Sequence, residues 1–259
     1  MKQLFIMANW KANKTFQETM AFVDELGQLM HKMVKNDPEK INVLEHNLYS
    51  IAAPLTNLSA LMIMLYKNMQ KRKEFYNLEI ASQDVSEFDQ GPFTGDSPAF
   101  MLAALKTKYV IIGHSERRRF HRENEIIVNS KAKKVLEQNM TPVICVGESL
   151  EEYNENRTKE VIEEQLKTSL KDLDYSKIII SYEPIWAIGN KAATPKEANE
   201  ICQIIRQYTN NQCKVLYGGS VNKSNIHELG SQPNIDGFLV GGASLKAESF
   251  LDLITTQID

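Results

Sequence analysis

The sequence predicts a closed parallel (β/α)₈ barrel that forms a single domain over residues 1–259. Three observations indicate this fold. Short apolar runs alternate with segments of helical period eight times along the chain. The runs are continuously apolar, as parallel strands buried on both faces are, and no Pro/Gly/Ser-rich linker divides them. An open doubly wound sheet is the alternative, but no G-x-G-x-x-G follows the first run, so the barrel is favoured.

Each expected strand is a run rich in β-branched or apolar residues. The eight runs are Leu4–Met7, Ser50–Ala53, Glu79–Gln83, Tyr109–Gly113, Val143–Val146, Ile178–Tyr182, Val215–Tyr217 and Gly237–Val240.

Helix starts between these runs are marked by capping patterns. Capping boxes begin at Thr15, Ser149 and Thr194, the last with proline at the first helical position, and Ser97-Pro98 is a further cap followed by proline. The connection Lys35–Asn47 is long and polar, and we expect a surface insertion there, on the face of the barrel away from the catalytic end, with no inferred function. The uncharged stretch His46–Tyr66 contains Pro54, which indicates a strand followed by a helix rather than a membrane span.

Composition excludes several classes of protein. The 30 basic and 33 acidic side chains give a net charge of −3, without the basic excess of a nucleic-acid-binding protein. The three cysteines are odd in number and lack the paired spacing of a zinc site, which indicates a reducing compartment, no disulfide framework and no structural metal. The apolar run Leu4–Met7 is too short for a signal-peptide core. We therefore expect a cytoplasmic, soluble protein.

Chemistry-bearing residues follow the expected strands, where the active sites of such barrels lie. Asn9-Trp10-Lys11 follows the first strand, His114-Ser115-Glu116 the fourth and Glu183 the sixth. Glycine pairs follow the seventh and eighth strands, at Gly218-Gly219-Ser220 and Gly241-Gly242, and backbone N–H groups exposed there can cradle phosphate. A carboxylate base, an imidazole, a cation and an anion cradle together suit proton abstraction next to the carbonyl of a small phosphorylated substrate.

Taken singly, each of these residues has an ordinary structural explanation. Glu183 fits a plain strand-end carboxylate, His114 a half-buried histidine and Lys11 a solvated lysine. Cys145 is expected to be a small buried apolar residue without a redox role. The joint placement of the polar residues on strand ends favours the functional interpretation.

Six segments, in order along essentially the whole chain, closely resemble signatures of the triosephosphate isomerase family. They are Asn9–Lys11, Gly113–Arg118, Cys145–Glu148, Tyr182–Gly189, Tyr217–Ser220 and Leu239–Ala243. The resemblance implies a TIM barrel that interconverts D-glyceraldehyde 3-phosphate and dihydroxyacetone phosphate, in glycolysis, gluconeogenesis and the pentose shunt, with no metal or organic cofactor.

The resemblance also implies the role of each site residue. Glu183 is the base, and His114 polarises the carbonyl as a neutral imidazole; the family is itself a standard example of this pairing, so both roles are taken from the resemblance. Lys11 supplies positive charge, Asn9 binds substrate oxygens and Glu116 orients Lys11. Backbone groups at Gly189, Ser220, Gly241 and Gly242 hold the phosphate. A helix beginning at Ser115 is expected to favour the neutral imidazole.

Two loops complete the expectations from the family. The lid is expected at Pro184, Ile185, Trp186, Ala187, Ile188, Gly189, Asn190, Lys191, Ala192 and Ala193. It is one residue shorter than usual, with Asn190 in place of a Thr-Gly pair. A dimer loop with Thr94, Gly95 and Asp96 is expected to reach a partner subunit in a homodimer, where Thr94 would brace the partner's Asn9 and Lys11. Asp84, Pro92 and Asp96 replace the family's asparagine, alanine and glutamate, and Asp84 is expected to alter interface polarity.

Two other functions compete with the isomerase. Another phosphate-binding barrel enzyme, such as a Schiff-base aldolase, needs a reactive lysine deep on a central strand, whereas Lys11 stands at a strand end. A barrel kept only for binding or scaffolding predicts loss of Lys11, His114 or Glu183, and all three are present.

Overall fold

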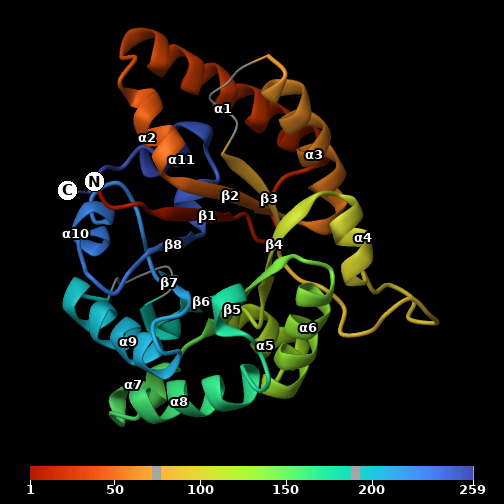
Figure 1. The fold of residues 1–259 in the computed structure, drawn as a ribbon, viewed down its shortest axis with the longest axis vertical. Coiled ribbons are helices and arrows are strands. Elements are labelled where there is room, and N and C mark those ends of the chain that lie inside the picture. Colours follow the sequence, from red (N-terminus) through yellow and green to blue (C-terminus); the bar gives the residue numbers. More distant parts are fainter. Residues whose placement is uncertain (72–76, 188–192, 259) are drawn as a thin grey trace.

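The computed structural model describes residues 1–71, 77–187 and 193–258. Within them, parallel strands pair in sequence order and close into a barrel, because β8 also pairs with β1 (Figure 1). The strands are β1 Phe5–Asn9, β2 Leu48–Ala53, β3 Leu78–Ser82, β4 Thr107–Ile112, β5 Thr141–Val146, β6 Ile179–Tyr182, β7 Lys214–Tyr217 and β8 Gly237–Val240. The predicted (β/α)₈ fold is confirmed.

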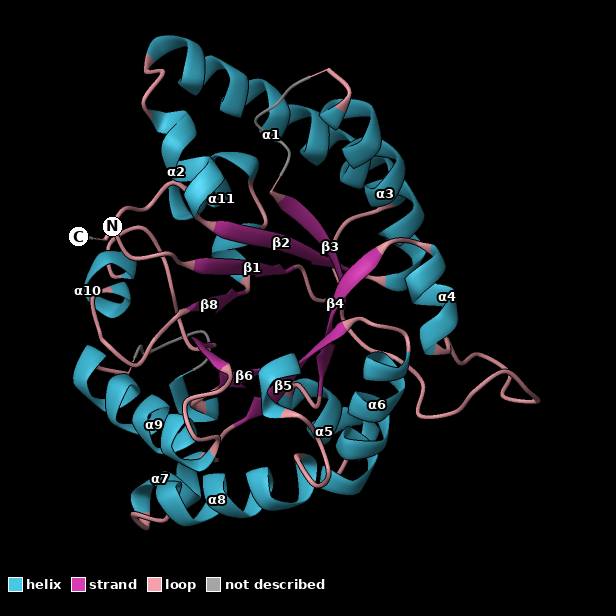
Figure 2. Ribbon diagram, in the orientation of Figure 1, coloured by secondary structure: helices cyan, strands magenta, loops and turns pink. Residues whose placement is uncertain are grey.

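Helices surround the strands, as Figure 2 shows. They are α1 Phe16–Asn36, α2 Lys40–His46, α3 Leu55–Met69, α4 Ala99–Ala104, α5 Ser115–His121, α6 Glu125–Glu137, α7 Leu150–Asn154, α8 Thr158–Ser169, α9 Pro195–Tyr208, α10 Ile226–Gly230 and α11 Ala247–Ile254. Short 3₁₀ turns η2 Tyr175–Lys177, η3 Ile185–Ala187 and η4 Gly242–Ser244 lie between them. The stretch His46–Tyr66 forms β2 and most of α3, as predicted, and no helix in the described ranges is long and apolar enough to cross a membrane.

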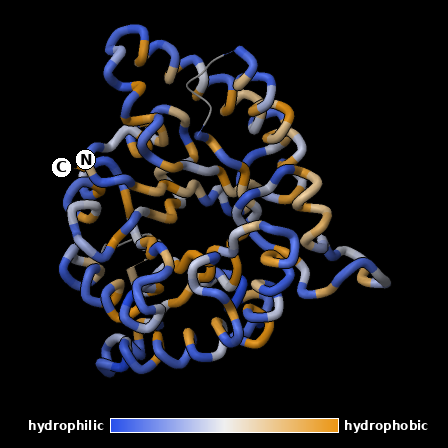
Figure 3. The backbone as a smooth tube through the Cα atoms, viewed as in Figure 1, coloured by the Kyte–Doolittle hydropathy of each residue, from blue (hydrophilic) through white to orange (hydrophobic). Residues whose placement is uncertain are grey.

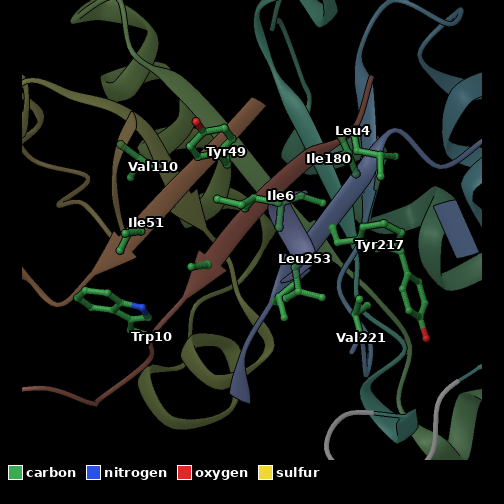
Figure 4. Packing of buried hydrophobic residues seen from close by; sticks show 14 of the residues in the cluster. Leu4, Ile6, Trp10, Tyr49, Ile51, Val110, Ile180, Tyr217, Val221 and Leu253 are labelled. Carbon is green, nitrogen blue, oxygen red and sulfur yellow. The ribbon is translucent and has the colours of Figure 1, made fainter. Parts of the chain in front are cut away.

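Two hydrophobic cores follow from the alternation of side chains along each strand. On β1, Phe5 and Met7 belong to a cluster inside the barrel, whereas Ile6 and Ala8 face the helices. The outer cluster is the larger one, and Figure 4 shows its members Ile6, Ile51 and other strand residues on neighbouring strands. In Figure 3, orange (hydrophobic) stretches occur on the barrel strands, and the helices alternate between blue and orange. Burial on both faces explains why the strands read as continuous apolar runs.

Three of the four helix starts predicted from capping sequences are correct. Thr15, Ser149 and Thr194 each form the predicted capping box with the glutamate three residues later, at α1, α7 and α9. At α4 the prediction was wrong by one residue, because Pro98 occupies the N-cap position and Ser97 lies before it, where its carbonyl accepts the Ser86 N–H.

The end of the fourth strand also differs from the prediction. Gly113 is not part of β4, since its φ of +66° turns the chain out of the extended region. A Cβ at this position would lie 2.6 Å from a methyl carbon of Val128, so the turn requires glycine in both conformation and space. The turn aims His114 toward the barrel mouth.

The connection 35–47 contains a helix, so its description as a polar surface insertion was incomplete. α2 buries Val43 and Leu44 and is held by side chains that precede strands. Gln3 donates to the His46 carbonyl, and Asn77 donates to the carbonyls of Leu44 and Glu45. Since Gln3 and Asn77 precede β1 and β3, α2 lies at the N-terminal end of the barrel, as expected.

A buried ion cluster joins the loop after β3 to α5 and α6. Lys131 Nζ lies 2.6 Å from both Asp84 Oδ1 and Glu123 Oε1, and Arg117 pairs with the same two carboxylates. Burial opposes ionisation of Glu123, but hydrogen bonds and charges from Lys131 and Arg117 outweigh it and lower its pKa. Burial raises the pKa of Asp84, and the nearby Glu123 adds to this effect. Asp84 is therefore paired within its own chain.

Replacing Glu123 by glutamine is expected to destabilise the fold by about 2–3 kcal/mol at pH 7. The loss is below that of a fully broken buried pair, because Asp84 still faces Lys131 and Arg117. The folded-state pKa of Glu123 is lowered, so the stabilisation by its carboxylate is complete above the unfolded-state pKa and disappears as pH falls through the folded-state value.

Urea unfolding of Glu123→Gln and wild type at pH 7 and below pH 4 tests this pH dependence. Exposed Glu163→Gln is the control and should change stability by under about 0.5 kcal/mol; an equal loss for Glu123→Gln at both pH values contradicts the pairing argument.

Candidate active site

A cavity of about 390 Å³ opens at the C-terminal ends of the strands. Nearly all the described residues that the sequence placed at this mouth line it: Asn9, Lys11, His114, Glu183, Gly218, Gly219, Ser220, Gly241 and Gly242. Glu116 contacts the cavity-lining Lys11, whose Nζ donates to Glu116 Oε1 at 2.7 Å. Gly189 lies outside the described residues. The strand ends therefore bring the expected base, imidazole and cation together.

Lys11 is held in a strained backbone conformation. Its φ is +52°, in the left-handed region that disfavours side chains. The Asn9 side chain accepts the Lys11 N–H at 3.1 Å, and Gln83 Nε2 donates to the Lys11 carbonyl at 3.0 Å and to the Ala52 carbonyl at 2.9 Å. These contacts fix the turn that aims Lys11 into the cavity.

Gln83 was missed as a site residue, although it follows β3 just as His114 and Glu183 follow their strands. We expect Gln83→Leu to lower kcat/KM about 10-fold, since a small displacement of Lys11 misplaces its ammonium group. It should also cost about 1–2 kcal/mol of stability, because two carbonyls lose a donor. Steady-state kinetics and urea unfolding measure the two effects. Gln28→Leu, at an exposed position on α1, is the control. Lost stability with unchanged kinetics would mean that Gln83 only supports the fold.

His114 is the N-cap residue of α5, which begins at Ser115 as predicted. Its Nδ1 accepts the Glu116 N–H at 3.2 Å. A ring nitrogen that accepts a hydrogen bond carries no proton, so the proton of this neutral tautomer is on Nε2. Nε2 lies 3.2 Å from Glu183 Oε1. The imidazole therefore presents a hydrogen-bond donor beside the carboxylate.

Glu183 follows β6, and its side chain is almost completely buried. Oε2 accepts the Ser115 N–H at 3.1 Å, whereas Oε1 lies 3.2 Å from His114 Nε2, and the pair does not have the geometry of a hydrogen bond. A buried carboxylate oxygen with an incomplete hydrogen bond costs free energy, and such groups concentrate at functional sites. A Cβ at Gly218 would lie 2.9 Å from Glu183 Cγ, so glycine is needed there for the carboxylate to occupy this place. Sequence reasoning missed the Ser115 contact because it is made by a backbone group.

The lid segment is described only at its two flanks. Trp186 Nε1 donates to Glu148 Oε1 at 2.8 Å, and Tyr182 donates to the same oxygen at 3.0 Å. Burial raises the pKa of Glu148, and both donors oppose that rise. On the other side, the Ala193 N–H donates to the Tyr217 hydroxyl at 3.2 Å. Ile188, Gly189, Asn190, Lys191 and Ala192 lie outside the described residues.

The segment between β3 and α4 projects from the barrel (Figures 1 and 2). Its tip, with Thr94, Gly95 and Asp96, is exposed, and Asp96 Oδ2 accepts a hydrogen bond from the Ser86 hydroxyl at 2.6 Å. The exposed rings of Phe88 and Phe93 stack with centroids 4.2 Å apart. Asp84, at the base of the loop, points into the ion cluster with Arg117 and Lys131.

Cys145, Cys202 and Cys213 are free and buried. Burial and the neighbouring Glu183 raise the pKa of Cys145 well above its usual range, so the thiol stays protonated at neutral pH. In the described part of the chain, no group of three or more His, Cys, Asp or Glu side chains is placed to hold a metal ion.

A parallel barrel with a carboxylate, an imidazole and an ammonium group at its C-terminal mouth defines the class of (β/α)₈ enzymes that act by acid–base chemistry on small substrates. Within that class, the family model of triosephosphate isomerase matches residues 4–257, and the chain belongs to this family.

Relatives and solved structures agree with this assignment. The chain is 46% identical to a triosephosphate isomerase of Mesomycoplasma hyorhinis, over 98% of this chain and 99% of the relative. It is 45% identical to that of Mycoplasmopsis pulmonis, with 98% of each chain covered. The crystal structure of the enzyme from Bartonella henselae superposes with a TM-score of 0.82 at 33% identity, covering 97% of each chain.

Proposed function

We propose that this chain interconverts D-glyceraldehyde 3-phosphate and dihydroxyacetone phosphate in glycolysis, with Glu183, His114 and Lys11 carrying the chemistry. Membership of the triosephosphate isomerase family supports the reaction. The observation that carries the residue roles is the buried Glu183 carboxylate, which lies 3.2 Å from His114 Nε2 and lines the same cavity as His114 and Lys11.

The geometry suits a proton transfer through an enediolate. Glu183 takes a proton from the carbon beside the substrate carbonyl and returns it to the adjacent carbon. The Nε2–H of His114 donates to the oxygen on which negative charge develops, and a fixed donor at that point is often the largest catalytic term. The Lys11 ammonium group, oriented by Glu116 and with its backbone fixed by Asn9, attracts the phosphorylated substrate and the enediolate.

Phosphate binding is assigned to the part of the cavity that follows β7 and β8. Ser220, Gly241 and Gly242 line it, and η4 begins at Gly242. Backbone N–H groups at the start of a helical turn favour anions, which supports this assignment. Gly189 is proposed as a further phosphate contact, and residues 184–193 as a lid, from the family resemblance alone.

A Schiff-base aldolase is less well supported. Lys11 lies on a turn after β1 and its Nζ is ion-paired with Glu116, whereas an aldolase needs a reactive lysine on a central strand. No observation favours a scaffolding role.

A proton-NMR time course of glyceraldehyde 3-phosphate with purified protein, recording dihydroxyacetone phosphate and methylglyoxal, tests the function. Rapid isomerisation with background methylglyoxal is the expected result. Excess methylglyoxal would keep the reaction but show that the short lid fails to protect the intermediate. No conversion by folded protein would overturn the proposal.

We also propose a cytoplasmic homodimer that serves gluconeogenesis and the pentose shunt as well as glycolysis. The buried free cysteines suit a reducing compartment, and the projecting loop with exposed Phe88, Phe93 and Thr94 suits a partner subunit. Sedimentation at working concentration tests the dimer; a fully active monomer would show that Thr94 of a partner is not needed to brace Asn9 and Lys11.

A further inference from the structure

The loop between β1 and α1 contains two lysines in left-handed backbone conformations. The φ angle is +52° at Lys11 and +73° at Lys14. A side-chain amide holds each turn, because Gln83 donates to the Lys11 carbonyl at 3.0 Å and the buried Asn57 donates to the Lys14 carbonyl at 2.7 Å. Non-glycine residues keep such conformations only where their surroundings impose them, and they cluster at active sites. Lys11 lines the cavity, whereas the proposed chemistry does not explain the strain at Lys14.

The side chain of Lys14 reaches the loop that follows β8. Its Nζ donates to the Leu245 carbonyl at 2.8 Å, directly after η4. Leu245 lines the candidate cavity together with Gly241 and Gly242. Lys14 therefore joins the loop after β1, which carries Lys11, to the loop after β8, to which phosphate binding is assigned.

Two aromatic rings also hold the ammonium group of Lys14. Nζ lies 5.0 Å from the ring centroid of Trp10 and 4.6 Å from that of Phe22, and these two rings pack edge to face with centroids 4.9 Å apart. A cation placed near such rings is attracted by their π electrons. Trp10 is fully buried and itself lines the cavity. The end of the Lys14 side chain is therefore fixed beside the cavity wall.

No ion pair neutralises the charge of Lys14 in the described part of the chain. Among residues 1–71, 77–187 and 193–258, no carboxylate oxygen lies within 4.0 Å of its Nζ. Burial lowers the pKa of Lys14, and the more distant Glu18 and Glu25 only partly oppose this effect. Glu18 is exposed and accepts the Thr15 N–H in the capping box of α1. A half-buried cation without an ion-pair partner raises the local electrostatic potential, which favours an anionic ligand at the adjacent loop.

We propose that Lys14 is a positioning residue for phosphate binding. It fixes the loop after β8 against the loop after β1, and its charge adds to the attraction for the phosphate group of the substrate. A binding loop that is already in place loses less conformational entropy when its ligand binds. The proposal rests on the proposed function, which assigns the phosphate to Ser220, Gly241 and Gly242. It deepens that function by adding an affinity-determining residue outside the cavity.

Three substitutions at Lys14 test the proposal. Lys14→Met keeps an unbranched side chain on the two rings but removes the charge and the donor to Leu245. Lys14→Gly removes the side chain at a φ that glycine adopts without strain, so the turn itself is not disturbed. Lys14→Arg keeps the charge, the ring contact and a donor, and is the rescue variant. Glycerol 3-phosphate is the binding probe, because it carries the phosphate group but has no carbonyl and cannot be isomerised.

We expect the Kd of glycerol 3-phosphate, measured by calorimetry, to rise about 5-fold in Lys14→Met and Lys14→Gly and to stay within about 2-fold of wild type in Lys14→Arg. The KM for glyceraldehyde 3-phosphate should rise in parallel. The value of kcat should change by less than about 2-fold, because Lys14 does not touch the reacting atoms. Lys32→Met removes the same charge at an exposed position on α1, and this matched control should leave Kd unchanged.

A Kd within about 2-fold of wild type in both Lys14→Met and Lys14→Gly would overturn the proposal. A lower thermal midpoint with unaltered Kd and KM would also overturn it, since Lys14 would then only support the fold. The wild-type time course judges the proposed function separately. Wild-type isomerisation with unchanged variant affinity would refute the role of Lys14 alone, and absent isomerisation with weakened variant binding would refute the function alone.

Discussion

Replacing Glu183 by glutamine is expected to lower kcat by roughly 10³- to 10⁴-fold while KM changes by less than about 3-fold. Positioned acid–base groups contribute up to about this factor, and glutamine cannot take a proton from carbon. The effect falls on kcat because the carboxylate is needed for the transfer, whereas the substrate charge is held by Lys11 and the glycine-rich side of the cavity. Steady-state kinetics in both directions of the reaction provide the measurement.

A second substitution tests the placement of the same carboxylate. Glu183→Asp keeps the charge but withdraws it by one methylene, and we expect a loss of about 10²-fold, since a displacement near 1 Å costs about that much. The exposed Glu163→Gln variant should match the wild type. If Glu183→Gln retained more than a tenth of the wild-type kcat, with its fold intact, the base would have to be another group.

The fold was predictable because its signals are local. Continuous apolar runs marked the strands, and the capping boxes at Thr15, Ser149 and Thr194 formed as expected. Strand starts were less accurate, because they depend on partners distant in sequence. Leu48 pairs with Phe5, and Thr141 pairs with Tyr109, so β2 and β5 both begin two residues before the predicted positions.

The site was predictable to the extent that it depends on strand ends. Closure of the barrel brings the ends of β1, β4 and β6 to one mouth, which places Lys11, His114 and Glu183 around one cavity. The supporting contacts were not predictable in the same way. The Ser115 N–H on Glu183 is a backbone group with no sequence signature, and Gln83, after β3, reaches Lys11, after β1, across the intervening β2. Side-chain identity carries no information about such distances.

Lys11→Met is expected to lower kcat/KM by roughly 10³-fold, with the loss divided between a higher KM and a lower kcat. Methionine keeps the unbranched shape and most of the length of the side chain but removes the charge that attracts the phosphorylated substrate and stabilises the enediolate. The substitution also leaves the Glu116 carboxylate near the cavity without its partner 2.7 Å away, so the anionic substrate meets an uncompensated negative charge. A 10³-fold loss corresponds to about 4 kcal/mol of transition-state stabilisation.

The free energy of unfolding should hardly change in Lys11→Met. This result would separate the contribution of Lys11 to catalysis from its contribution to stability. The Lys11–Glu116 pair is 29% and 46% exposed, and solvent-screened pairs of this kind contribute about 1 kcal/mol or less. The double variant Lys11→Met/Glu116→Gln should recover part of the lost affinity, because it removes the unpaired carboxylate, but should not recover kcat.

Urea unfolding and steady-state kinetics on the single and double variants test both expectations. A kcat/KM within 10-fold of wild type, or a rescue of kcat by Glu116→Gln, would show that the Lys11 charge does not act on the reacting atoms.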